Sequence, residues 1–200
     1  MEATMDITQL DHPIDAMYLI HKALRAEAER VEAAVDQLAV GGSFKPFQRA
    51  FYRWAMALGY HVDVEEKHVT SWLPDTLLAQ AGATGRQHVM ELLEELQTYL
   101  HADLGRTLVI PRTQRQLRHK VIALRLVQED LLEEEEERVL PVLRQHMSAA
   151  QQLALIQRLL IDEEAEEQSD MLDWVAQDLT TTERQWLAGL DARFTTVPVV

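Results

Sequence analysis

The sequence predicts an all-helical protein, and three features of its composition and spacing lead to that prediction. The 200-residue chain contains only seven glycines and six prolines, which favours long uninterrupted helices over turn-rich β structure. These residues fall at intervals that cut the chain into long segments. Within the segments, apolar residues recur at alternating steps of three and four, the period of a helix that buries one face.

We expect an up-down-up-down four-helix bundle with additional C-terminal helices. The expected long helices span residues 13–41, 46–74, 87–102, 113–145 and 149–178. Asp15 could help to start the first helix, and Pro141 should kink or break the fourth because proline removes a helical N–H. Residues 1–147 would form the bundle, and residues 148–200 a helical extension packed on it. Residues 180–183 offer a capping box for a short last helix.

Charge and residue types exclude several classes of function. The net charge of -14 argues against a nucleic-acid partner and against adsorption to anionic membranes. The absence of cysteine excludes disulfides and cysteine-bound iron–sulfur clusters, so histidine, aspartate or glutamate must hold any metal. No apolar run reaches the roughly 18–20 residues of a membrane span, and the acidic N-terminus lacks the pattern of a signal peptide. We therefore expect a soluble cytoplasmic protein, either a monomer or a homodimer.

Candidate metal ligands interrupt the apolar stripes of the first two helices. The first stripe runs from Ile14 to Leu38 and is apolar except at His21. The second contains His61, Glu65 and His68 in phase with aromatic and aliphatic residues. His61 and Glu65 are four residues apart and so share one helix face. Because a buried carboxylate is costly unless it is paired or bound to a metal, this pair indicates a site.

The third and fourth stripes each add one candidate. His88 is in phase with Leu92 and Leu96, and Glu135 is the residue of the run 133–137 that is in phase with the apolar positions of its helix. Taken singly, an inward histidine is more often an ordinary core residue, and a run of glutamates is usually a solvated face. Taken together, they predict a site of imidazole and carboxylate ligands, which suits iron, manganese or zinc. The predicted ligands are His21, His61, Glu65, His88 and Glu135.

The order of these residues resembles the hemerythrin-like, or HHE cation-binding, domain family. That family has a histidine on its first and third helices and an HxxxE motif on its second and fourth. The matching segments are Ile14–Glu27, His61–Pro74, Arg86–Leu96 and Leu131–Leu143. The resemblance implies a non-haem diiron site at the five predicted ligands. It also implies interaction with dioxygen, nitric oxide or peroxide, for sensing, storage or redox protection.

The fourth helix departs from the family pattern at Leu131, where the family has its last histidine. Leucine cannot bind a metal, so the ligand set is one residue short, and three explanations remain open. A diiron centre could be held with one ligand fewer, or His68, Gln128 or Glu134 could substitute. Alternatively, the diiron centre is lost, and the bundle holds a single metal, a haem or nothing.

Two other classes of function are alternatives to the hypothesis of a diiron protein. A haem could be clamped by two facing histidines and lined by aromatic residues. Those aromatic residues are Phe51, Trp54, Trp72 and Tyr99. A metal-free interaction module could instead use the polar residues of the seam only to fix the helix register.

Overall fold

The computed structural model describes residues 10–73, 83–103, 108–161 and 170–194, and within these ranges it contains helices and no strand. The long helices are α1 (Ala16–Asp36), α2 (Lys45–His68), α4 (Ala83–Asp103) and α5 (Pro111–Glu134). They are followed by the π-helical segment η3 (Glu135–Val139), α6 (Leu140–His146), α7 (Ala149–Leu160), α8 (Asp170–Ala176) and α9 (Thr181–Phe194). Short 3-10 turns lie at Pro13–Asp15 (η1) and Thr70–Trp72 (η2). The all-helical prediction is confirmed for this part of the chain, and none of its helices is long and apolar enough to cross a membrane.

The chain divides into two compact units, one of residues 24–138 and one of residues 1–23 with 139–200. This division differs from the expected boundary after residue 147. In the second unit the turn η1 packs against α6 and α7, and the N–H of Ile14 donates to the side chain of Gln152 on α7 at 3.4 Å. The start of the chain therefore belongs with its C-terminal helices.

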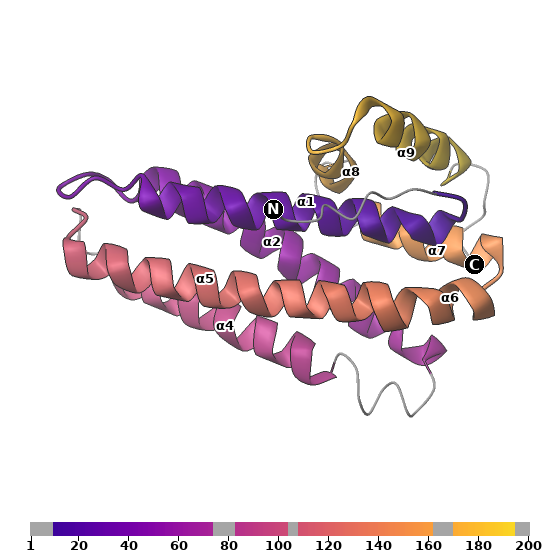
Figure 1. Ribbon diagram of the computed structural model, residues 1–200, viewed down its shortest axis with the longest axis horizontal. Coiled ribbons are helices and arrows are strands. Elements are labelled where there is room, and N and C mark those ends of the chain that lie inside the picture. Colours follow the sequence, from indigo (N-terminus) through magenta and orange to yellow (C-terminus); the bar gives the residue numbers. More distant parts are fainter. Residues whose placement is uncertain (1–9, 74–82, 104–107, 162–169, 195–200) are drawn as a thin grey trace. The chain divides into compact units, whose positions relative to one another are not determined.

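In the unit of residues 24–138, α4 and α5 lie side by side in opposite directions (Figure 1). The Tyr99 hydroxyl near the end of α4 donates to Gln116 near the start of α5 at 2.7 Å. One turn earlier on α4, Glu95 pairs with Lys120, one turn later on α5. These cross-links fix the register of an antiparallel helix pair.

Ion pairs give the direction of α1 relative to α5 in the same unit. Arg25 contacts Glu129 at 2.8 Å, and Asp36 contacts Arg118 at 2.8 Å. The later residue of α1 thus meets the earlier residue of α5, so the two helices are antiparallel. Ion pairs between residues this exposed each add little stability, but together they define the register of α1 against α5.

Helix α2 runs in the same direction as α5. The Trp54 indole N–H donates to Gln128 Oε1 at 2.7 Å, and seven residues later His61 lies 3.6 Å from Glu135. Both contacts join residues 74 apart in sequence, and seven residues make two helical turns. With α1 and α4 antiparallel to α5, these directions are compatible with the predicted up-down-up-down order.

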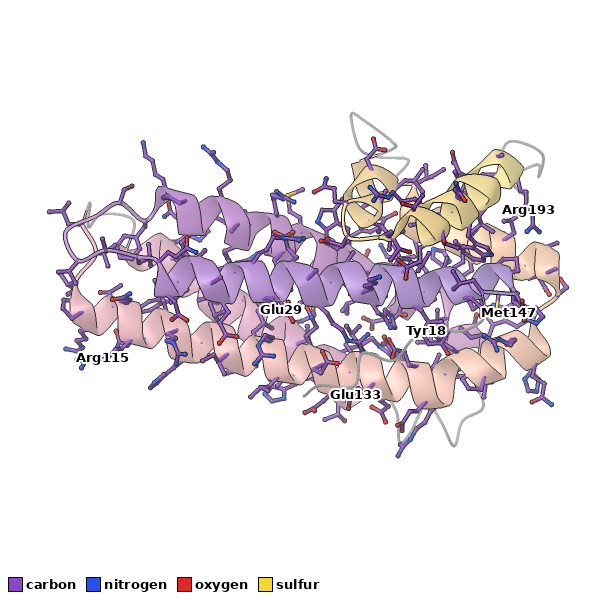
Figure 2. The ribbon with its side chains drawn as sticks, turned by 45° about the horizontal axis from the view of Figure 1, so that its top comes forward. Tyr18, Glu29, Arg115, Glu133, Met147 and Arg193 are labelled. Carbon is purple, nitrogen blue, oxygen red and sulfur yellow. The ribbon has the colours of Figure 1, made fainter. Side chains whose placement is uncertain are left out.

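The break expected at Pro141 takes the form of the π-helical segment η3, which ends two residues before it. Proline lacks an N–H and its ring crowds the carbonyl four residues earlier, so the preceding turn widens. In this stretch two consecutive glutamates, Glu135 and Glu136, are only 1% and 8% exposed. Glu133 and Glu137 are exposed. Figure 2 shows that Glu133 and Arg115 lie far apart along α5.

The C-terminal helices belong to the other unit, in which α7 contacts both α8 and α9. The predicted capping box is present: Thr180 N–H donates to Glu183 at 2.6 Å, and Glu183 N–H donates to the Thr180 hydroxyl at 3.3 Å. Lys22 also pairs with Glu183 at 2.8 Å. The helix expected over 149–178 is described at its two ends, as α7 and α8, while residues 162–169 lie outside the described ranges.

Asp15 starts the first helix, as expected, and it also joins two parts of its unit. Its carboxylate accepts the N–H groups of Asp11 and His12 at 2.9 and 2.8 Å. The same side chain, only 1% exposed, pairs with Arg144 on α6. One residue therefore caps a helix start and anchors it to the C-terminal part of the chain.

Replacing Asp15 by alanine is expected to lower the free energy of unfolding by about 2–3 kcal/mol, because the cap and the ion pair are lost together. Urea unfolding measures this change. Asp173→Ala removes the same group from an exposed position on α8 and should change stability by less than about 0.5 kcal/mol. Equal effects of the two substitutions would contradict the assigned role of Asp15.

Candidate metal centre

Among the described residues, four side chains could hold a metal ion together. His21, His61, Glu65 and Glu135 each offer one ligand atom, and these atoms all lie within 4.8 Å of one another. Each side chain is at most 1% exposed. The unit of residues 24–138 contains three of them, His61, Glu65 and Glu135.

His61 lies between the two carboxylates of the group. Its Nε2 atom is 3.6 Å from Glu65 Oε1 and 3.6 Å from Glu135 Oε2. These distances are too long for hydrogen bonds. Two donor atoms that each lie about 2.1 Å from one ion at tetrahedral angles are about 3.4 Å apart. The spacing around His61 is that expected of ligands that share one ion. Glu65 and Glu135 also share a side-chain hydrogen bond, so the two carboxylates pair with each other when no cation is bound.

Local structure explains why these side chains face the interior. On α2, Trp54, Leu58, His61 and Glu65 follow steps of four, three and four, and all are at most 1% exposed. Glu135 is the first residue of the π-helical segment η3. Such segments are frequent at functional sites, because they turn a side chain away from its regular helical position.

Burial controls the protonation of the carboxylates. It raises the pKa of Glu135 from 4.5 to about 7. A hydrogen bond with Glu65 and the charge of Arg86 oppose this rise, and nearby Glu136 and Glu134 add to it. Burial also raises the pKa of Glu65 well above its usual value, with a further contribution from Glu135. Without a cation the pair therefore favours a protonated Glu65 at neutral pH, while Glu135 titrates close to neutral pH; a bound metal would displace the protons of both groups.

Burial acts on the histidine of the group in the opposite direction. It lowers the pKa of His61, although Glu65 partly opposes this effect. A neutral imidazole is the form that donates a nitrogen lone pair to a metal. The site thus offers His61 in its ligating state at neutral pH.

Arg86 on α4 is a charged residue of this site that the sequence analysis did not identify. It is 6% exposed, and its Nη1 atom lies 4.0 Å from Glu135 Oε1. The sequence does contain an indication that Arg86 is buried, because Arg86 begins a stripe of apolar residues with steps of three and four. The other members of the stripe are Val89, Leu93, Leu96 and Leu100, each at most 3% exposed.

His88 is a predicted ligand that the structure does not bring to the group. It is exposed on α4, and it lies outside the four residues that come together. The stripe expected through His88, Leu92 and Tyr99 is displaced by one position, because Val89 and the following leucines turn inward instead. In the structure His88 therefore lies on the exposed face of α4, one position away from the buried stripe.

His88→Ala is expected to leave both the metal content and the free energy of unfolding unchanged. The side chain is exposed, and such substitutions usually change stability by less than about 0.5 kcal/mol. Metal analysis and urea unfolding of the purified variant test this. A loss of bound metal would show that His88 reaches the site after all.

None of the three possible substitutes for the missing ligand belongs to the group. Gln128 is fully buried, but its Oε1 atom accepts the Trp54 indole N–H. Glu134 is half-buried and pairs with Arg138 at 3.0 Å. His68 is half-buried at the end of α2.

Leu131, where the family pattern has its last histidine, is part of the packed interior. Its side chain is 1% exposed, and its Cδ1 atom lies 3.3 Å from the place where a Cβ on Gly85 would be. The leucine thus fills space against the backbone of α4. The site has hydrocarbon at this point instead of a ligand.

The aromatic residues proposed to line a haem pocket pack in other ways. Phe51 and Trp54 are fully buried and meet edge to face, with ring centroids 6.5 Å apart. The Tyr99 hydroxyl donates a hydrogen bond to Gln116, and Trp72 is half-buried in η2. These contacts are typical of core packing and give no specific support to the hypothesis that the protein binds a haem.

Fold and site together define an all-helical protein with a buried histidine–glutamate group that could hold a metal ion. Comparisons with protein-family models, with characterised proteins and with solved structures give no significant match to this chain.

Proposed function

We propose that this chain is a hemerythrin-like helical protein that binds one non-haem iron ion through His21, His61, Glu65 and Glu135. The observation that carries the proposal is the position of His61, fully buried and 3.6 Å from both carboxylates. Two imidazoles and two carboxylates suit iron, manganese or zinc. The choice of iron rests on the resemblance of the motifs to the hemerythrin-like family.

A single ion fits the residues better than a pair of ions. One ligand atom from each of the four side chains lies within 4.8 Å of the others, as for ligands of one centre. Among the described residues, the positions expected to provide the other ligands of a second ion do not do so, because His88 is exposed and Leu131 is a buried leucine. The cationic Arg86 beside Glu135 also disfavours a second metal ion by charge repulsion.

The side chains have distinct roles in this proposal. His21 and His61 would donate imidazole nitrogens, and Glu65 and Glu135 would neutralise a divalent charge. These four side chains would hold the iron, and the bound iron would supply the binding of dioxygen, nitric oxide or peroxide. The surrounding apolar side chains would exclude water and tune the reduction potential. Sensing, storage or redox protection are the roles that such a site would serve.

Metal analysis of protein purified from iron-supplied cells, together with its absorption spectrum, tests this function. We expect about one iron per chain and no Soret band. About two irons would contradict the single-ion site, and one equivalent of zinc or manganese would contradict the choice of iron. A Soret band would favour haem. Less than about 0.2 metal per chain, without haem, would favour the metal-free interaction module.

A further inference from the structure

The guanidinium of Arg86 is a buried charge that the proposed binding of iron does not use. The side chain is 6% exposed on α4, and its nearest approach to Glu135 is 4.0 Å, beyond hydrogen-bonding distance. A guanidinium stays protonated at all physiological pH values and has five N–H donors. Its contact with Glu135 is therefore electrostatic and leaves donors for another group.

The charges of the site do not balance when Arg86 is included. Two neutral imidazoles, two carboxylates and a divalent ion sum to zero. The nearby carboxylates Glu136 and Glu134 are paired with Arg25 and Arg138, so Arg86 adds one positive charge. A ferric ion would raise the total to two positive charges. An excess charge in a buried site is costly unless an opposite charge accompanies it. A small monoanion at the open position of the metal would reduce this excess.

We propose that Arg86 makes the site selective for a small anionic ligand on the bound metal, over a neutral ligand of similar size. This inference rests on the proposed function and identifies the class of ligand. The metal ion would bind the anion, and the guanidinium, held on α4, would stabilise its charge. Arg86 is thus a specificity-determining residue, and a neutral ligand would gain little from it.

The test compares an anionic probe with a neutral one in iron-loaded, full-length protein. Azide binding to the ferric form and nitric oxide binding to the ferrous form are titrated by absorption spectroscopy. Arg86→Gln should weaken azide binding at least about tenfold and change nitric oxide binding less than about threefold. Arg86→Lys, which keeps the charge, should keep azide affinity within about threefold of the wild type.

Two controls separate recognition by Arg86 from wider effects. Arg118→Gln removes one positive charge from an exposed position on α5 that pairs with Asp36, and it should leave azide affinity unchanged. Iron content and the circular dichroism spectrum are measured for every variant. Arg86→Met provides a second neutral replacement if Arg86→Gln does not retain its iron.

Several outcomes would overturn the inference. These are unchanged azide affinity in Arg86→Gln, equal weakening of azide and nitric oxide, or an iron-loaded wild type that binds no azide. Loss of iron in both neutral variants would show that Arg86 positions Glu135 and does not recognise an anion. Each of these results leaves the proposed iron binding intact. A wild type without iron, in contrast, would overturn the proposed function and this inference with it.

Discussion

Replacing His61 by alanine is expected to abolish metal binding while the helices remain folded. His61 Nε2 is 3.6 Å from both Glu65 and Glu135, so it lies next to both carboxylates of the group. Its loss should weaken metal affinity on the order of 100-fold or more, since even residues that only support a ligand contribute 10- to 100-fold. Iron per chain should fall below about 0.1 after dialysis.

His88→Ala is the matched control for this experiment. It makes the same chemical change on α4, at an exposed residue outside the group, and should keep the iron content of the wild type. Far-ultraviolet circular dichroism should show the same helix content in both variants. Iron content in His61→Ala equal to that of the control would remove the central observation from the proposal.

Much of the fold follows from local sequence. Glycine and proline separate the helices, and the stripes of α1, α2 and α5 have the predicted phase. His21, His61, Glu65 and Glu135 are accordingly buried. In these helices one continuous stripe of apolar residues has steps of three and four, so the phase of a polar residue on that stripe follows from its neighbours.

The phase of α4 could not be fixed in this way, because its apolar residues form two overlapping stripes. One stripe passes through Leu92 and the other through Leu93, and both share Leu96. Packing against α5 selects the second stripe, which buries Arg86 and exposes His88. A buried arginine is uncommon, so the sequence alone favours an inward position for His88. The packing of α4 against α5 instead buries Arg86.

The division of the chain was also beyond local sequence. The turn η1 and α7 are separated by more than 130 residues, yet Ile14 bonds to Gln152 and Asp15 pairs with Arg144. Such contacts depend on tertiary packing and leave no periodic signal in either segment. The capping box at residues 180–183, in contrast, is a local interaction and was predicted correctly.

The carboxylates that suit the site to a cation should destabilise the metal-free protein at high pH. Below pH 4.5 Glu135 is protonated in both folded and unfolded chains. As the pH rises from 4.5 to about 7, the unfolded carboxyl ionises first, so stability is lost through the folded pKa of about 7. A rise of this size corresponds to about 3 kcal/mol. Glu65 acts in the same direction, whereas the lowered pKa of His61 acts in the opposite direction and only below pH 6.5.

Glu135→Gln should therefore stabilise the metal-free protein by about 2–3 kcal/mol at pH 8 and by less than about 0.5 kcal/mol near pH 4.5, because glutamine resembles the protonated acid. Urea unfolding at the two pH values measures this difference. Glu133→Gln, at an exposed position on α5, should show no such dependence. Equal stability of Glu135→Gln and the wild type at pH 8 would mean that burial does not raise the pKa of Glu135 in the folded, metal-free protein. The same variant should lose iron, since an amide oxygen is a weaker ligand than a carboxylate and cannot neutralise the ion. Higher stability with loss of metal is the combination expected of a residue that is retained for binding at a cost to folding.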